Sequence, residues 1–320
     1  MQVTLNLVRD LLLANDNFLI LTHKNPDGDT LGSALALCLA LNDAGKCAYI
    51  LENEGTTDRF IARISPLHAP RDFTPDFVIS VDTAASDMLS KNSSHYADRV
   101  DLAIDHHISH KEYAKNTLVC GDSAACGEII WEIILSLGTT VTDKIAEAIY
   151  IAISTDTSCF LNANTTAKTH EIAAKLYSFD VDFSALHREF FITKTRARLA
   201  IEANLIANMN FYFDGAVAIM RLDNQMIASA GATEDDLDNI SALARSVEGV
   251  ELGILVRERE EGISKISMRS SERVNASEIC SFFGGGGHIR AAGGTIESAP
   301  CEAEAKIVEH LCAIFNSEKK

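Results

Sequence analysis

Three short apolar runs in the first part of the chain each end directly at a residue that can bind a metal ion. The runs and the residues that follow them are Phe18–Thr22 before His23, Phe77–Val81 before Asp82, and Val100–Ile104 before Asp105. Short continuous apolar runs are typical of strands that are buried on both faces of a parallel sheet. Because ligands of open α/β sheets bind at the carboxyl ends of the strands, we expect the three side chains to converge.

The stretches between and after these runs have helical character. Thr30–Ala44 places apolar residues at helical spacing, and the apolar stretch Ile145–Ser154 leads, as a predicted helix, to Asp156. Buried strands that alternate with amphipathic helices indicate an α/β fold. We therefore predict an N-terminal domain over residues 1–190, with a mostly parallel sheet flanked by helices.

The pattern changes in the second half of the chain. Residues 157–210 are predicted to be helical and more polar, with Lys194–Arg198 on a long helix. Three predicted strands, a glycine-rich turn and a final helix follow, at Ala216–Leu222, Leu252–Val256, Ile263–Arg269, residues 284–287 and Ala303–Phe315. This order predicts a helical linker over residues 191–210 and a smaller C-terminal α/β domain over residues 211–320.

The charge balance limits which partners the chain can bind. Lys and Arg together number 28 against 45 Asp and Glu, which gives a formal net charge of −17. Proteins that bind long duplex nucleic acid neutralise many phosphates with cations, so we exclude that class. A small phosphate substrate remains compatible with this charge, because a few arginines and bound divalent metals can reverse the field inside one site.

The remaining composition predicts a cytoplasmic protein with no membrane association. The N-terminal segment lacks the pattern of a signal peptide, and no apolar run is long enough to span a bilayer. The eight cysteines are scattered without C-x-x-C spacing. We expect them to be small buried hydrophobic residues in a reducing compartment.

The turn after the first apolar run brings two carboxylates close together. It reads His23-Lys24-Asn25-Pro26-Asp27-Gly28-Asp29, in which Pro26 and Gly28 favour a tight turn. Hard divalent cations prefer carboxylate oxygens, and imidazole shifts the preference toward Mn²⁺, Fe²⁺, Co²⁺ or Zn²⁺. Two such ions, about 3.5–4 Å apart, can activate water for in-line attack on phosphorus. An aspartate after a strand is by itself more often a helix cap, so the prediction rests on the combination.

Several motifs together resemble those of the DHH phosphoesterase superfamily. They are the turn His23–Asp29, Val81-Asp82, Asp105-His106-His107 and Thr155-Asp156-Thr157. The sequence Phe283-Gly284-Gly285-Gly286-Gly287-His288-Ile289-Arg290-Ala291-Ala292-Gly293 is similar to the GGGH-x-x-A-A-G motif of the DHH-associated C-terminal domain. The superfamily includes RecJ exonucleases, family II pyrophosphatases and NrnA-type oligoribonucleases, and the chain is similar to the NrnA type.

This resemblance implies a set of metal ligands and catalytic residues. One metal would be held by His23, Asp27 and Asp82, and the second by Asp29, Asp82, His106 and Asp156, with Asp82 bridging. Asp105 would orient the following histidine without binding metal itself, and His107 would face the scissile phosphate and assist charge or proton transfer. Some members let Asp156 contact both metals. The implied cofactors are two divalent ions, with Mn²⁺ favoured and Mg²⁺ or Co²⁺ as alternatives.

One segment departs from the family pattern. After Thr157, NrnA-like proteins commonly carry Gly and a large aromatic residue, whereas this chain has Ser158-Cys159-Phe160-Leu161. The departure affects the expected shape of the pocket beside the metals and leaves the ligand set intact. We expect a structural role for Cys159 in preference to a reactive thiol.

The resemblance also implies that the region around the C-terminal motif binds the nucleotide part of the substrate. Consecutive glycines let backbone N–H groups approach an anion, and arginine suits bidentate contact with a terminal phosphate. The residues expected to bind are Arg269, Ser270, Arg273, Gly286, Gly287, His288 and Arg290. His288 and Arg290 are expected at the start of a helical stretch. Arg290 as a surface cation and the glycine run as a plain flexible turn remain alternatives.

These features predict an Mn²⁺-dependent phosphoesterase that hydrolyses short oligoribonucleotides to mononucleotides, and 3′-phosphoadenosine 5′-phosphate to AMP. Hydrolysis of a cyclic or linear dinucleotide is the main alternative. A RecJ-like single-strand exonuclease is disfavoured, because an acidic chain of 320 residues lacks both an extended basic channel and room for a further nucleic-acid-binding domain. A pyrophosphatase and a non-catalytic nucleotide-binding module are weaker alternatives, and a homodimer stays open.

Overall fold

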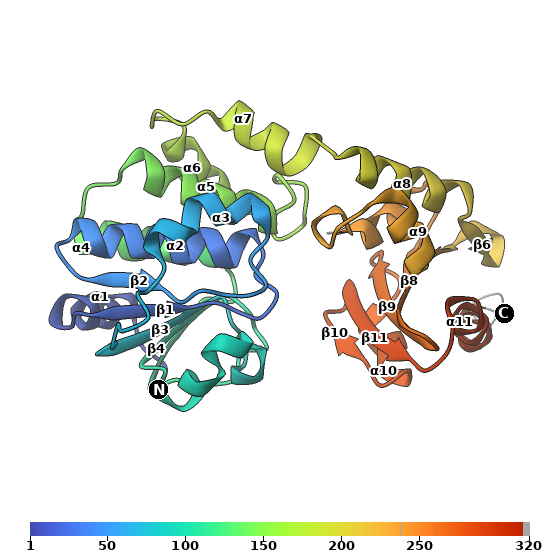
Figure 1. The fold of residues 1–320 in the computed structure, drawn as a ribbon, viewed down its shortest axis with the longest axis horizontal. Helices are drawn as coiled ribbons and strands as arrows, with labels where there is room; N and C mark the ends of the chain where they lie inside the picture. The colour runs from blue at the N-terminus through green and yellow to red at the C-terminus, as the bar shows by residue number, and fades with distance from the viewer. Residues whose placement is uncertain (238, 316–320) are drawn as a thin grey trace. The chain divides into compact units, whose positions relative to one another are not determined.

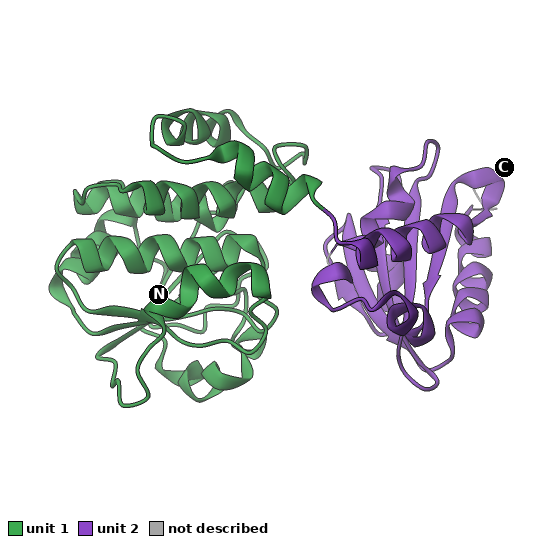
Figure 2. Cartoon of the chain, turned by 45° about the horizontal axis from the view of Figure 1, so that its top comes forward, with its two compact units in different colours: residues 1–193 green, residues 194–320 purple. Residues whose placement is uncertain are grey.

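The computed structural model describes residues 1–237 and 239–315. The chain divides into two compact units, unit 1 over Met1–Thr193 and unit 2 over Lys194–Lys320 (Figure 2). The predicted linker over residues 191–210 contains helix α8 (Arg196–Ala207), which belongs to unit 2. Lys194 and Thr195, predicted on the same helix, precede it, and the Thr195 side chain caps its first turn.

Unit 1 is built on a five-stranded parallel sheet (Figure 1). The strand order is β2-β1-β3-β4-β5, and every neighbouring pair is parallel. The strands are β1 Phe18–Leu21, β2 Ala48–Ile50, β3 Phe77–Val81, β4 Leu102–Asp105 and β5 Asn116–Val119. The three apolar runs before His23, Asp82 and Asp105 form β1, β3 and β4 at the centre of the sheet, so their carboxyl ends share one edge.

Helices cover one face of this sheet. They are α1 Leu5–Ala14, α2 Gly28–Asp43, α3 Asp58–Ile64, α4 Cys126–Leu137, α5 Asp143–Asp156, α6 Ala167–Leu176 and α7 Phe183–His187. Helices α2 and α5 approach closely because Gly32 lacks a Cβ atom, which would lie 2.6 Å from the carbonyl oxygen of Ala148. A Cβ on Gly28 would likewise collide with the side chain of Thr155. The start of α2 therefore lies against the end of α5.

The other face of the sheet has a thinner cover. Leu19, Leu21 and Val78 on this face pack with Leu89 and Val100. The cover consists of loops and the 3₁₀ segments η2 (Ser86–Met88) and η3 (Lys91–Arg99). The main apolar core of unit 1 therefore lies between the sheet and helices α2, α4 and α5.

Unit 2 contains a six-stranded mixed sheet in the order β10-β11-β9-β8-β7-β6. Its strands are β6 Asn210–Tyr212, β7 Val217–Leu222, β8 Leu252–Glu260, β9 Ile263–Ser270, β10 Gly286–Gly287 and β11 Ala291–Ile296. Its helices are α8, α9 Asn224–Ala230, α10 Ala276–Phe282 and α11 Pro300–Phe315. Strands β7 and β8 pair in parallel and the other pairs are antiparallel. The structure thus has the predicted α/β class in both halves.

Two layers of helix cover different parts of this sheet. One face packs its apolar residues, such as Ile254, Ile266 and Met268, against α10 and α11. The opposite face packs Met220 of β7 and Leu255 of β8 beneath α8 and the 3₁₀ segment η7 (Ile240–Ser246). Side chains alternate between the faces along each strand, which explains the two separate apolar clusters.

Two predictions made from the sequence were wrong in detail. His288 and Arg290 do not begin a helix: they form the turn between the short strand β10 and strand β11, where consecutive small residues pair with β9. The cysteines are not uniformly buried. Cys38, Cys126 and Cys280 are buried, whereas Cys301 and Cys312 are exposed on α11.

In the described part of the chain, no helix is both long enough and apolar enough to cross a membrane.

Candidate metal centre

The side chains that were predicted to form the metal site gather at the carboxyl edge of the unit 1 sheet. His23 follows β1, Asp82 follows β3, and Asp105 ends β4, which are neighbouring strands. Asp82 has a positive φ of 50°, an uncommon backbone conformation for a residue other than glycine. This backbone conformation turns the chain directly after the strand. Strain of this kind is concentrated at functional sites.

The start of α2 places Asp27 and Asp29. Asp27 caps the helix and accepts a hydrogen bond of 3.0 Å from the backbone N–H of Thr30. Asp29 is buried in the first turn, where its carboxylate accepts hydrogen bonds from the backbone N–H groups of Cys126 at 2.6 Å and Gly127 at 2.9 Å. These two N–H groups belong to the first turn of α4, so a helix N-terminus stabilises the buried charge.

The predicted ligands form three overlapping groups whose potential donor atoms lie within 4.8 Å of one another. The groups are His23–Asp27–Asp82, Asp29–His106–Asp156 and Asp82–His106–His107. Asp82 and His106 each occur in two groups. The structure thus brings together all six side chains that were expected to bind metal, and places His107 beside them.

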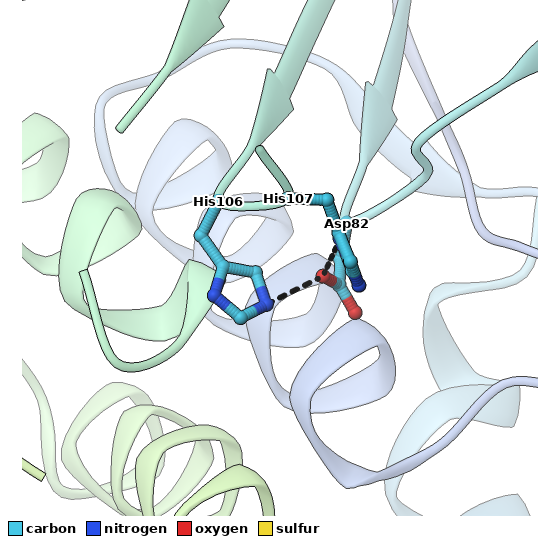
Figure 3. Close-up of side chains that lie close together, drawn as sticks. All are labelled: Asp82, His106 and His107. Atoms are coloured by element: carbon cyan, nitrogen blue, oxygen red, sulfur yellow. Dashed lines mark ion pairs between the residues drawn. The ribbon is translucent and has the colours of Figure 1, made fainter. Parts of the chain in front are cut away.

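Asp82 lies at the centre of this arrangement. Its Oδ2 accepts a hydrogen bond of 2.5 Å from the Thr30 hydroxyl. Its Oδ1 is buried and makes no hydrogen bond with the described residues, although His106 Nε2 and His107 Nδ1 lie 3.5 and 3.6 Å from it (Figure 3). Buried carboxylate oxygens are normally satisfied, so an unpaired Oδ1 marks a place for a missing partner.

The electrostatics of the group fit a divalent cation. Burial raises the pKa values of the Asp29 and Asp82 carboxyl groups well above the ordinary value for aspartate. The charge of Asp156 raises the pKa of Asp29 further, and the charge of Asp29 does the same for Asp82. Burying several carboxylates together is costly unless a cation compensates their charge. Oxygen and imidazole donors of this kind suit Mn²⁺, Mg²⁺ or Co²⁺.

Asp105 holds two imidazole rings, and neither belongs to His106. Its Oδ1 lies 2.7 Å from His107 Nδ1, and its Oδ2 lies 2.7 Å from His110 Nδ1. Burial raises the pKa of Asp105, but the hydrogen bonds from His107 and His110 outweigh it and hold the pKa below its usual range. The carboxylate is therefore ionised and orients both rings.

The ring of His106 has a different partner from the one predicted. Of the groups of His106, only the backbone N–H donates to Asp105, whereas His106 Nδ1 lies 3.2 Å from the carbonyl oxygen of Ser123. A carbonyl only accepts, so Nδ1 carries the proton and Nε2 is free to bind a cation. His106 Nε2 faces the carboxylates of Asp82, Asp29 and Asp156 at 3.5, 3.7 and 4.0 Å.

His107 is positioned to carry positive charge. Burial lowers the pKa of His107, but the hydrogen bond and charge of Asp105 outweigh this effect and raise the pKa above its ordinary value. The ring is partly exposed, with 25% of its side chain accessible. His107 is therefore a donor at the rim of the carboxylate group.

Asp156 is the last residue of α5 and accepts a hydrogen bond of 3.3 Å from Asn164 Nδ2. Directly after it, Ser158, Cys159 and Phe160 all have positive φ values, between 49° and 66°. This left-handed turn is formed by the segment in which the sequence departs from the expected family pattern. Burial raises the pKa of the Cys159 thiol, which agrees with a structural role.

The residues predicted to bind nucleotide gather at one end of the unit 2 sheet, with one exception. Arg269 pairs with Ala291, and the glycines of β10 pair with β11 beside it. His288 and Ala291 exchange backbone hydrogen bonds across the turn, and the Ser270 hydroxyl donates to the carbonyl oxygen of Ile289. The guanidinium of Arg290 contacts the carbonyl oxygen of Ser271. Arg273 differs, because it forms an exposed ion pair with Glu251 at 2.9 Å.

Four features of the metal centre were not predicted from the sequence. They are His110, the Thr30 hydroxyl, the Ser123 carbonyl and the N-terminus of α4. His110 follows the Asp105-His106-His107 triplet closely in the sequence, so it could have been noticed there. The other three are backbone groups or a common hydroxyl, which carry no sequence signal.

Comparisons with known proteins agree with this fold. The family model for the DHH family, N-terminal domain, matches residues 17–153, and the model for the DHHA1 domain matches residues 214–317. A bifunctional oligoribonuclease and PAP phosphatase, NrnA from Thermus thermophilus, is 32% identical over 92% of this chain and 88% of that protein. Cyclic-di-AMP phosphodiesterase PdeA from Listeria monocytogenes is 23% identical over 97% of this chain, but only 50% of that protein is covered.

A solved structure shares the fold over nearly its full length. It is an exopolyphosphatase-related protein from Bacteroides fragilis, with a TM-score of 0.86, 21% identity, and coverage of 98% of this chain and 97% of that one. The fold and the carboxylate–histidine group define the class of metal-dependent phosphoesterases. The chain belongs to the DHH family and is a hydrolytic enzyme.

Proposed function

We propose that this protein hydrolyses short oligoribonucleotides to mononucleotides and 3′-phosphoadenosine 5′-phosphate to AMP, with two divalent metal ions and Mn²⁺ as the preferred metal. The observation that carries the proposal is the overlap of the three ligand groups at Asp82 and His106. Shared ligands are what a two-metal site requires. The likeness to the Thermus oligoribonuclease and PAP phosphatase supports the substrate class.

In the proposed site, His23, Asp27 and Asp82 would hold one ion, and Asp29, Asp82, His106 and Asp156 would hold the other. A pair of divalent ions supplies Lewis acidity for attack by water and for the charge that develops on the phosphoryl oxygens. Against the effect of burial, the hydrogen bond to Asp105 raises the pKa of His107, which favours its protonated form, and would aim its ring at the substrate. His107 then offers positive charge or a proton to the phosphate ester.

Unit 2 supplies the proposed nucleotide contacts. Exposed Gly286 and Gly287 leave the backbone of this turn open to an anion, and partly exposed Arg269 offers a guanidinium for a terminal phosphate. Ser270, His288 and Arg290 lie in the same turn region and are assigned supporting contacts. Arg273 is the weakest member of the set, because Glu251 already pairs with it.

Hydrolysis of a cyclic dinucleotide or of its linear product is the second candidate. It is favoured by the likeness to the Listeria cyclic-di-AMP phosphodiesterase, of which this chain covers half. Long single-stranded DNA is disfavoured by the net charge of −17. We further propose a cytoplasmic location and leave a homodimer as the assembly to be tested.

A substrate panel at fixed enzyme concentration with Mn²⁺ tests the proposal. It contains a dinucleotide, a five-nucleotide RNA, 3′-phosphoadenosine 5′-phosphate, a cyclic dinucleotide, pyrophosphate and long single-stranded DNA. We expect the highest kcat/KM for the short RNAs, measurable activity on the adenosine bisphosphate, and loss of both in EDTA. Preference for the cyclic dinucleotide would select the second candidate. Preference for long DNA, or no hydrolysis with any divalent metal, would reject both.

A further inference from the structure

One peptide group of unit 1 links a buried carboxylate to the ring of His106. It is the group between Ser123 and Ala124, in the turn before α4. Its carbonyl oxygen lies 3.2 Å from His106 Nδ1, and its N–H donates to Glu128 Oε2 at 3.3 Å. A peptide group is planar and trans, so its two polar ends point in opposite directions and turn together. A contact that orients the N–H therefore also orients the carbonyl oxygen that His106 contacts.

The position of the Glu128 carboxylate is fixed from a second side. Glu128 lies in the first turn of α4 and is fully buried, and its Oε1 accepts a hydrogen bond of 2.6 Å from the hydroxyl of Thr169 on α6. Burying a carboxylate is costly unless it is hydrogen-bonded, and the two hydrogen bonds offset part of this cost. The N-terminus of α4 also favours a negative charge at this place. The carboxylate can therefore hold the peptide group in one orientation.

Capping of α4 explains only part of this arrangement. A glutamate at the third residue of a helix commonly reaches back to an N–H group at the start of the helix. That role can be filled by a carboxylate in contact with solvent. Glu128 is instead 0% exposed, and the peptide group that it orients contacts a predicted metal ligand.

The same turn contacts two further predicted ligands. The N–H groups that hold the Asp29 carboxylate lie at the start of α4, directly after the turn. Asn164 Nδ2 lies 2.9 Å from the carbonyl oxygen of Ala124 and 3.3 Å from Asp156 Oδ2. Asp29, His106 and Asp156 form one of the ligand groups. All members of this group are thus connected to the start of α4, directly or through Asn164.

The ligand group His23–Asp27–Asp82 is held by a different element. Thr30 of α2 donates its hydroxyl to Asp82 and its N–H to Asp27. A disturbance of the turn before α4 should therefore affect the two groups unequally. The ion proposed for the group of Asp29 is here called the Asp29 ion, and the ion proposed for the group of Asp27 is called the Asp27 ion.

We propose that Glu128 is a positioning residue for the Asp29 ion. Through the Ser123–Ala124 peptide group, it holds the ring of His106 with Nδ1 toward the carbonyl oxygen and Nε2 toward the ion. The inference rests on the proposed two-metal function and deepens it, because it makes the affinity for one ion depend on Glu128 while the affinity for the other does not. Partners that orient a metal-binding histidine change metal affinity by about 10- to 100-fold.

Glu128→Met in the full chain tests the proposal, with Glu132→Met as the matched control. Methionine keeps the length of the side chain and adapts to a buried position. Glu132 lies one turn further along α4 and pairs with Lys168 of α6 at 2.7 Å. Both substitutions therefore remove a contact between the same two helices, but only Glu128 contacts the turn before α4.

A titration with Mn²⁺, followed by the EPR signal of the free ion, gives the number of bound ions and their dissociation constants. We expect Glu128→Met to weaken the binding of one ion by about 10- to 100-fold and to leave the other unchanged. Glu132→Met should bind both ions as the wild type does. Glu128→Gln keeps an oxygen that accepts from the Ala124 N–H, so it should also keep both affinities.

Ligand variants identify the ion that is weakened. Asp27→Asn leaves the Asp29 ion, and Glu128→Met added to this variant should weaken that ion by the same factor. Asp156→Asn leaves the Asp27 ion, and Glu128→Met added to it should have no effect. Equal weakening of both ions, weakening of the Asp27 ion alone, or wild-type affinity for both in Glu128→Met would overturn the proposal.

A milder variant replaces Glu128→Met if that variant does not fold. Thr169→Val removes only the hydroxyl that orients Glu128 Oε1. It should weaken the Asp29 ion and leave the Asp27 ion unchanged. Wild-type affinity for both ions in this variant would then overturn the proposal.

Failure of the proposed function has a different outcome. The titration requires no turnover, so a wild type that binds two Mn²⁺ ions but hydrolyses no member of the substrate panel rejects the proposed substrates only. The same comparison of variants then supports or overturns the role of Glu128. A wild type that binds fewer than two ions overturns it.

Discussion

His110 and Asp105 form a buried pair in which His110 Nδ1 lies 2.7 Å from Asp105 Oδ2. The His110 side chain is 2% exposed, and its Nε2 makes no hydrogen bond with the described residues. The second oxygen of the same carboxylate holds His107 Nδ1 at 2.7 Å. His110 therefore fixes the plane of Asp105, and through it the ring of His107. In the proposed mechanism it would be a positioning residue.

Replacement of His110 should lower turnover more than substrate binding. We expect His110→Leu to reduce kcat by about 10- to 100-fold, the usual cost of removing a partner that orients a functional histidine, while KM changes less than threefold. His110→Asn retains an N–H donor toward Asp105 and should restore part of the loss. Steady-state kinetics on a dinucleotide measures both parameters.

His95→Leu is the matched control, because His95 lies in η3 of the same unit and contacts Tyr96 instead of the metal-binding group. Its kcat should equal that of the wild type. Equal kcat losses in His110→Leu and His110→Asn would show that the donor toward Asp105 is unimportant.

Metal binding should compensate the negative charge of the buried carboxylates of unit 1 and so stabilise the fold. Asp29 and Asp82 repel each other, and each lies in a buried position. We therefore expect Mn²⁺ to raise the Tm of the wild type and EDTA to reverse the rise. Asp82→Asn removes one buried charge, so its Tm in EDTA should exceed that of the wild type, while its Mn²⁺-dependent rise and its turnover are lost. Differential scanning calorimetry with and without EDTA measures these changes.

The exposed Asp72 provides the control for this comparison. Asp72→Asn should show the same Mn²⁺-dependent rise in Tm as the wild type. A full metal-dependent rise in Asp82→Asn would remove Asp82 from the ligand set.

The strand-end residues of the site could be predicted from the sequence, because strand ends are set by local apolar patterns. The runs before His23, Asp82 and Asp105 form three adjacent parallel strands, and topology alone then places these residues at one edge. The partners of the histidine rings could not be predicted. Which imidazole ring faces Asp105 depends on the path of the backbone directly after β4. The sequence predicts His106 in this role, whereas the rings of His107 and His110 contact the Asp105 carboxylate.

In unit 2, the strands could be predicted from the sequence, but the pairing of their residues could not. The sequence predicts strands near Leu252 and Ile263, but the partner of each residue depends on the register between them. Only this register places Lys265 opposite Arg257. The segment after the glycine run was predicted to be helical. It is instead a turn followed by strand β11, which pairs with β10 on one side and β9 on the other.

Glu202 should make the stability of unit 2 dependent on pH. Its carboxylate accepts hydrogen bonds of 2.7 Å from Lys194 and from Arg198, on and beside α8. Burial raises the pKa of Glu202, but the two cations outweigh it and hold the pKa below the ordinary value of 4.5. A lowered pKa in the folded state stabilises the fold above pH 4.5, and this contribution is lost as the pH falls through the lowered value.

We therefore expect Glu202→Gln to lower the free energy of unfolding by about 1 kcal/mol at neutral pH. The difference from the wild type should shrink as the pH falls below the ordinary glutamate pKa. Urea unfolding followed by circular dichroism at several pH values measures it. Glu309→Gln, an exposed position on α11, should match the wild type throughout. A difference that stays constant down to low pH would contradict the ionic origin of the effect.

Substitutions of two neighbouring glycines in the unit 2 loop should distinguish an effect on stability from an effect on substrate binding. A Cβ on Gly285 would approach the backbone carbonyl of Gly293 far too closely, whereas a Cβ on Gly286 would meet no atom within 4 Å. Gly285→Ala should therefore destabilise the fold by about 1–3 kcal/mol, the usual cost of overpacking.

Gly286→Ala should unfold at the temperature of the wild type and yet raise the KM for a dinucleotide, because the added methyl group shields the backbone that is proposed to approach the phosphate. Thermal unfolding and steady-state kinetics on both variants measure these effects. An unchanged KM in a normally folded Gly286→Ala would remove this glycine from the proposed nucleotide site.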